Sequence, residues 1–131
     1  MRLLVLLACS LLAVACGTGG ADRPPALPEA PAPAGATEFV ARPDIVEPRP
    51  LTITSWSRVG DDRIAVHFET GTPECFGVDA TVVETEDVVT VELRGGTLPE
   101  AQDRMCIMIA VTGVLELSLQ SPLGDRSVVA A

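Results

Sequence analysis

The strongest fold signal in this chain is the alternation of apolar and polar residues from Leu51 onward. Successive side chains of a strand point to opposite faces of a sheet, so this alternation predicts strands with one buried side. It recurs in five segments, at residues 51–56, 63–69, 78–82, 89–93 and 115–119. Turn-forming residues separate the segments. Their spacing predicts an all-β fold, a small antiparallel β-sandwich of Greek-key or Ig-like type, over residues 51–131.

One further segment does not alternate. Residues 106–111 read CIMIAV and are apolar at nearly every position. A strand that is buried on both faces has this pattern, so we expect a central strand there, or a strand covered by the preceding Pro-rich segment. Just before it, residues 99–105 have room for one helical turn.

Residues 17–50 have a different composition, because they hold eight of the eleven prolines. Proline lacks a backbone donor and favours extended polyproline geometry. We therefore expect residues 16–50 to form a disordered, semi-rigid tether. Within it, Phe39-Val40 and Ile45-Val46 have the apolar character needed to pack back onto the domain. A Pro-rich ligand for a partner is the alternative, which such scattered prolines support poorly.

Residues 1–15 read as a signal peptide. Arg2 precedes an apolar run of about 13 residues, whereas a spanning helix needs roughly 20. Cys16 follows the small residues Ala13-Val14-Ala15, and this arrangement resembles the lipobox of bacterial lipoproteins. The resemblance implies a lipid-modified Cys16 as the new N-terminus. An ordinary secretory cleavage, which would release a soluble protein, and an uncleaved signal remain alternatives.

Cleavage after residue 15 leaves Cys16, Cys75 and Cys106. Exported proteins usually pair their cysteines, so we expect a Cys75–Cys106 disulfide while Cys16 carries lipid. A redox pair would favour the close C-x-x-C spacing, which is absent. A structural metal site needs about four ligands, and the sequence has one histidine. We predict neither a metal nor a cofactor.

The charge of the chain limits its partners. The formal net charge is −9, and every basic residue is an arginine. Nucleic-acid binding depends on basic residues that neutralise phosphates, so we expect no nucleic-acid partner. Anionic lipid headgroups would also repel the domain and hold it off the membrane surface.

Two side chains are candidates for a binding role. His67 alternates with core-facing neighbours, which predicts a solvent-facing histidine, and Ser55, Ser57 and Asp79 are conceivable catalytic partners for it. Trp56 is expected to fill an edge of the core, with a sugar-binding or peptide-binding anchor as the alternative. We assign no catalytic residue.

Two acidic turns are also considered as binding sites. Glu84, Glu86 and Asp87 crowd one turn, but they lack the ligand pattern of a calcium loop, so a solvated hairpin tip is expected. Asp125-Arg126 is interpreted as a local turn pair.

Three stretches between Cys75 and Val129 resemble small exported actinobacterial lipoprotein-like β-domain proteins of unknown function. They are CFGVDATVVETEDVVTVEL, GTLPEAQDRMCIMIAV and LSLQSPLGDRSVV. The resemblance implies an exported or lipid-anchored β domain with paired cysteines, and it carries over no activity. Gly113 stands where we expect a longer side chain, which leaves the continuity of that strand open.

Together these features predict a cell-surface lipoprotein on the outer face of the cell membrane. We expect a non-catalytic binding or structural module that contacts a surface protein or a cell-wall partner through a sheet edge or an end loop such as residues 95–104. A small cell-wall enzyme is the alternative, and it would need a deep pocket joining His67 to a carboxylate or serine. A soluble secreted β domain and a ligand carrier with an apolar cavity between its sheets are further alternatives.

Overall fold

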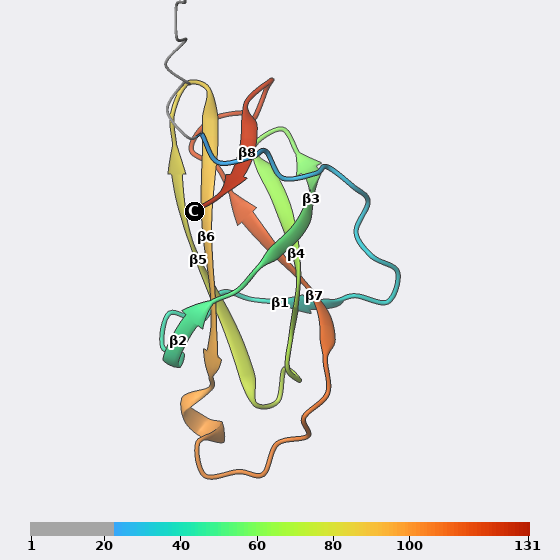
Figure 1. Ribbon diagram of the computed structural model, residues 1–131, viewed down its shortest axis with the longest axis vertical. Coiled ribbons are helices and arrows are strands. Elements are labelled where there is room, and N and C mark those ends of the chain that lie inside the picture. Colours follow the sequence, from blue (N-terminus) through green and yellow to red (C-terminus); the bar gives the residue numbers. More distant parts are fainter. Residues whose placement is uncertain (1–22) are drawn as a thin grey trace, which may run out of the picture.

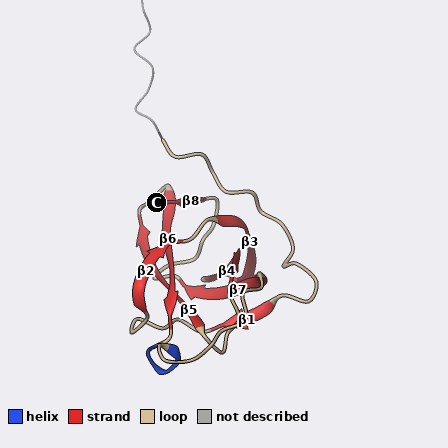
Figure 2. Cartoon of the chain, turned by 60° about the horizontal axis from the view of Figure 1, so that its bottom comes forward, coloured by secondary structure: helices blue, strands red, loops and turns tan. Residues whose placement is uncertain are grey.

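The computed structural model describes residues 23–131. The predicted signal peptide and Cys16 lie outside the described residues. The described chain forms two β-sheets packed face to face, which confirms the predicted all-β sandwich (Figures 1 and 2). Among residues 23–131, no helix combines the length and apolar character needed to cross a membrane.

The first sheet has four strands in the order β1-β7-β4-β3. In this order they are β1 (Thr37–Phe39), β7 (Val111–Ser118), β4 (Arg63–Thr70) and β3 (Ile53–Gly60). Strand β4 pairs antiparallel with β3 and β7, whereas β1 runs parallel to β7.

The second sheet is built around β6, the longest strand. Its strands are β2 (Val46–Pro50), β6 (Val88–Thr97), β5 (Phe76–Glu84) and β8 (Ser127–Ala130). Strands β2 and β5 pair antiparallel with β6, and β8 pairs parallel with it. Both sheets are therefore mixed, where the sequence predicted antiparallel pairing. The short 3-10 helix η1 (Pro99–Ala101) follows β6 and confirms the expected helical turn.

The main core lies between the sheets, and the alternating segments supply it. Each of the five segments contributes apolar residues to it, and a register shift between Ile53 and Ser55 brings both Ile53 and Trp56 of the first segment into the core. Fully buried side chains of this core include Ile64, Val66, Phe68, Val78, Val89, Val91 and Leu115. Phe68 also meets Phe39 of β1, with ring centroids 5.6 Å apart. The alternation thus predicted the inward face of β4, β5, β6 and β7, whereas the register shift in β3 was not predicted.

Gly113 lies inside β7, and the strand continues through it. A β-carbon on this residue would lie 2.5 Å from Phe68 Cε2 and 2.9 Å from Phe39 Cε2. The glycine therefore leaves the space that these two rings fill. The rings of Phe68 and Phe39 pack over Gly113, so the strand continues without a side chain at this position.

A second, smaller core closes one end of the sandwich. Ile45, Cys75, Leu98 and Ala101 are buried there, and Cys106 packs against them. Cys75 and Cys106 form the predicted disulfide, with their Cα atoms 6.1 Å apart. The bond ties the segment after η1 to the start of β5.

The prediction of a free tether is wrong for residues 26–50. Leu27 N donates to Val128 O at 2.8 Å, and β1 and β2 belong to the two sheets. As expected, Phe39 and Ile45 pack onto the domain, whereas Val40 is exposed. Proline removes a donor but keeps its carbonyl acceptor, so a Pro-rich segment can still lie along a sheet edge. Figure 2 shows the segment before β1 passing around the outside of the fold.

The prediction of a buried strand at residues 106–111 is also wrong. The segment precedes β7, and only Val111 belongs to the strand. Met105, Ile107, Met108 and Ile109 are all exposed, and Met108 keeps 86% of its surface open to solvent. Apolar composition alone cannot tell a buried strand from an uncovered loop.

Candidate binding cleft

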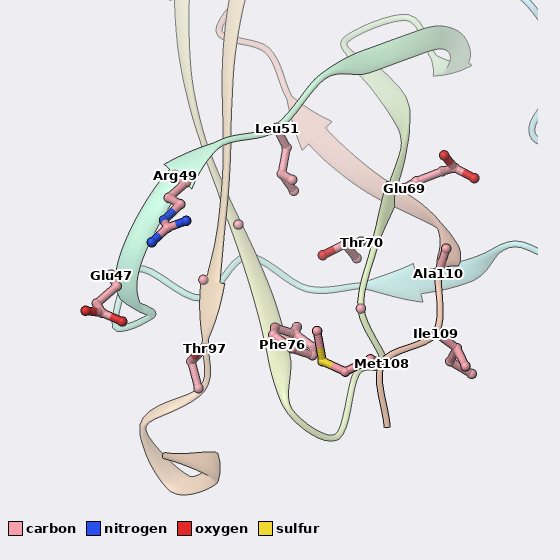
Figure 3. Close-up of a pocket in the computed structure, with 13 residues that line it drawn as sticks. Glu47, Arg49, Leu51, Glu69, Thr70, Phe76, Thr97, Met108, Ile109 and Ala110 are labelled. Atoms are coloured by element: carbon pink, nitrogen blue, oxygen red, sulfur yellow. The ribbon is translucent and has the colours of Figure 1, made fainter. Parts of the chain in front are cut away.

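A cleft opens at the end of the sandwich that carries the disulfide (Figure 3). Its volume is about 590 Å³. It lies between β2 and the end of β6 on one side and the end of β4 and the segment before β7 on the other. The cleft thus lies where the two sheets separate.

The floor of the cleft is apolar. Leu51 and Phe76 contribute side chains from opposite sides, and Met108 reaches toward Phe76 (Figure 3). Glycines make room for this floor: a β-carbon on Gly95 would lie 2.7 Å from Leu51 Cδ1, and one on Gly71 would lie 2.1 Å from Phe76 Cδ2. The backbone therefore lets both large side chains lie flat beside it.

The rim of the cleft carries charges of both signs. Glu47, Arg49 and Glu69 line it, and none of them forms an ion pair within residues 23–131. In Figure 3 the two carboxylates point away from the centre of the cleft. Glu47 has a φ of 52°, in the left-handed region, at the point where the pairing of β2 with β6 shifts register. Such a backbone is uncommon for a residue other than glycine.

Residues 105–109, which we call the apolar loop, contribute Met108 and Ile109 to one wall of the cleft. Within residues 23–131, this loop lies outside every paired strand, and its backbone makes no hydrogen bond to another backbone group. The disulfide at Cys106 holds it in place. The loop therefore presents uncovered apolar side chains and free backbone donors and acceptors together.

His67 is not in the cleft, and the prediction that it faces solvent is wrong. Its side chain is fully buried on β4. Nδ1 lies 2.7 Å from Ser55 Oγ, and Nε2 lies 3.1 Å from Ser57 Oγ. The imidazole fills the space between strands, and the serines on β3 satisfy both of its nitrogens. Burial lowers the pKa of His67, which keeps the ring neutral.

The structure brings together His67 and two of its three conceivable partners. The third, Asp79, lies in the other sheet, where Arg94 Nη2 donates to its carboxylate at 3.0 Å. Both ring nitrogens are engaged by hydroxyls, so no carboxylate orients the imidazole. A nucleophile and base need such an orienting group and access to substrate.

Trp56 fills the edge of the core, as expected. It is 5% exposed, and its indole Nε1 donates to Leu27 O at 3.0 Å. The Arg58 guanidinium lies 5.6 Å from the ring centroid. The indole therefore joins β3 to the Pro-rich segment and offers little surface to a ligand.

Glu86 and Asp87 are exposed at a solvated hairpin tip, as expected, whereas Glu84 belongs to a partly buried ion pair with Arg126. Arg126 Nη1 donates to Glu84 Oε1 at 3.1 Å, and Gln120 N donates to Oε2 at 2.7 Å. The backbone donor of Gln120, followed by Arg126, lowers the pKa of the Glu84 carboxyl. The predicted Asp125–Arg126 pair is therefore replaced by a longer-range contact. Within residues 23–131, no group of three or more potential metal ligands comes together.

Sequence reasoning missed the residues that build the cleft. Residues 95–97 were part of the expected end loop, but the apolar surface comes from the apolar loop, Leu51 and Phe76. One signal could have indicated this surface. The residues after Cys106 are consecutively apolar, whereas the strand-forming segments of the chain alternate. Such runs are unusual at a surface unless they have a function.

Comparison with family models, curated proteins and solved structures found no match to this chain. The resemblance to small exported actinobacterial proteins therefore stays a prediction.

Proposed function

We propose that this protein is an exported lipoprotein, anchored through Cys16 to the outer face of the cell membrane, and that its sandwich is a non-catalytic binding module. The observation that carries the binding role is the apolar loop beside the open cleft. Soluble domains seldom expose neighbouring large apolar side chains unless a partner covers them. The cleft and the apolar loop together form the proposed binding surface.

The arrangement of the two ends supports this reading. The N-terminal end of the described chain lies near β8, whereas η1 and the cleft lie at the opposite end (Figure 1). An anchor at Cys16 would hold the β8 end toward the membrane. The binding surface would then face outward, toward other surface components.

The enzyme alternative has weaker support. Its one favourable contact is that of Ser55 with His67, at 2.7 Å. A hydrolase needs this pair at the floor of a substrate pocket with an orienting carboxylate. The cleft lies elsewhere, and the second ring nitrogen is engaged by Ser57. Binding therefore accounts for the exposed features better than catalysis does.

The test begins with the anchor, in cells that make the protein naturally. Mass spectrometry of the membrane fraction should find an acylated Cys16 as the first residue. Cys16→Ala should move the protein to the culture fluid, whereas Cys9→Ala, the matched control in the same segment, should leave it anchored. Wild-type protein found wholly in the culture fluid with an unmodified first residue would favour the soluble secreted alternative.

The same cells test the binding role. A photo-crosslinking amino acid at Ile107, in the apolar loop, should give a discrete adduct. The same group at Val83, an exposed valine on β5, should give none. Equal labelling from both positions, or none from either, would contradict a binding surface at the cleft.

A further inference from the structure

We infer that the partner of the apolar loop is a second copy of this chain, and that the two loops pair as antiparallel strands about a two-fold axis. This inference rests on the proposed function and deepens it, because it names what covers the binding surface. Three features of the loop carry it: its free backbone, its order of side chains and the charges around it.

The backbone of the loop is ready to pair. It runs directly into β7, whose first residue Val111 already pairs with Thr70 of β4. Figure 1 shows the segment between η1 and β7 running along the open end of the molecule. Residues 105–109 make no backbone-to-backbone hydrogen bond within the described chain. An unpaired segment that leads into a strand offers its backbone donors and acceptors to a strand from another molecule.

The order of side chains is self-complementary. In an antiparallel pair centred on Met108, Ile107 lies opposite Ile109 of the second copy, and Met108 lies opposite its own equivalent. Cys106 and Ala110, both small, oppose each other. No charged residue occurs between Met105 and Val111, so two identical strands bring no like charges together. This matters in a chain with a net charge of −9, whose copies otherwise repel.

The side chains leave room for the second copy. Met108 reaches over the cleft toward Phe76, and Ile109 points away from it (Figure 3). Met108 is 86% exposed, so most of its side chain is free to meet a second molecule. A flexible thioether side chain adapts well to an apolar surface that approaches it.

The mixed charges on the rim of the cleft suit a second copy of this chain better than they suit a partner that is uniformly acidic or uniformly basic. Glu47 and Glu69 lie on the same rim as Arg49 and form no ion pair within residues 23–131. A two-fold axis presents the same surface to itself, so the guanidinium of one copy can face a carboxylate of the other. Anchoring in one membrane would raise the effective concentration of the two surfaces.

The first experiment measures association directly. The full-length chain carrying Cys16→Ala is exported without lipid and studied by sedimentation over a wide range of concentration. We expect a monomer–dimer equilibrium that stops at the dimer. Met108→Asp places two carboxylates opposite each other and should weaken the dimer by at least tenfold. Val83→Asp, at an exposed valine on β5, should leave the association unchanged.

The second experiment tests the register. Residues opposite each other in an antiparallel pair have Cα atoms about 4.5–5.5 Å apart, within reach of a disulfide. Met108→Cys with oxidised glutathione should therefore give a reducible dimer: the two thiols lose two protons and two electrons, and the oxidant becomes two reduced glutathione molecules. Val83→Cys should give none, and peptide mapping should show Cys75–Cys106 intact.

The outcomes separate this inference from the proposed function. A monomer at every concentration, dimers insensitive to Met108→Asp, or growth into open-ended aggregates would overturn the two-fold pairing. If the Ile107 probe then captures a different surface protein, the binding module stands and only the second copy is wrong. If the probe captures nothing, both proposals fail.

Discussion

At the scale of single residues, His67 shows how strand alternation assigns a side chain to a face without deciding its exposure. The residue lies on the face opposite the main core, as its position predicts, yet it is fully buried. Ser55 and Ser57 on the neighbouring strand hydrogen-bond to its ring. One hydroxyl donates to a ring nitrogen and the other accepts from the ring N–H, so the neutral form satisfies all three groups.

His67 should make the stability of the domain depend on pH. Burial lowers its pKa in the folded state, whereas the unfolded value is about 6.5. The unfolded chain therefore takes up the proton first, so the stabilisation is complete above about pH 6.5 and is lost as the pH falls toward the lowered pKa. Urea unfolding should show this decline in the wild type. His67→Gln should remove it, and a wild-type curve that is flat across this interval would contradict the prediction.

Three carboxylates should change the stability of the domain at lower pH. Glu84, Asp44 and Glu100 have lowered pKa values because N–H donors and arginines stabilise their charged forms. Their contribution is present above their unfolded pKa values, 4.5 for the two glutamates and 3.8 for Asp44, and is lost as the pH falls through the lower folded values. The histidine effect therefore begins below about pH 6.5, before the carboxylate effect begins, so the upper part of this interval reports on His67.

At the scale of elements, the disulfide decides where the apolar loop lies. Cys75 begins the approach to β5, and Cys106 is the second residue of the loop. Arg104 N donates to Ala101 O at 3.1 Å, but residues 105–109 have no such support within the described chain. The covalent bond therefore holds a segment that hydrogen bonds do not.

Removing the disulfide should destabilise the domain and release the loop. For a closed loop of about 32 residues, the chain-entropy estimate is roughly 3.7 kcal/mol. We expect Cys75→Ser with Cys106→Ser to lower the unfolding free energy by about 2–5 kcal/mol, measured by denaturant titration. Trypsin should also cut after the exposed Arg104 faster than in the wild type. Equal stability and equal cleavage would show that packing alone holds the loop.

At the scale of the whole molecule, the folded domain begins near residue 26, although the composition of the sequence changes only at residue 51. Residues 26–50 supply β1, β2 and two buried side chains, Phe39 and Ile45. Burying one such side chain stabilises a fold by about 1.5–3 kcal/mol, and domains of ordinary size have only about 5–15 kcal/mol in total. The Pro-rich segment is therefore a structural part of the sandwich.

Truncation should show this dependence. A chain of residues 24–131 should unfold cooperatively, with a Tm close to that of the full-length protein. A chain of residues 51–131 lacks two strands and exposes core side chains, so it should show no cooperative transition by circular dichroism. If the shorter chain unfolded cooperatively with unchanged stability, residues 26–50 would be a tether after all.

Local pattern was enough to predict β3 to β7 and most of their inward-facing side chains, because alternation depends only on strand geometry, but it missed β1, β2 and β8. The number of cysteines in an exported chain was enough to pair Cys75 with Cys106. The exposure of residues 105–109, the burial of His67 and the docking of residues 26–50 depend on which distant segments arrive to cover a surface. Alternation states which side chains share a face, but only the packing of one sheet against its neighbours decides whether that face meets protein or water.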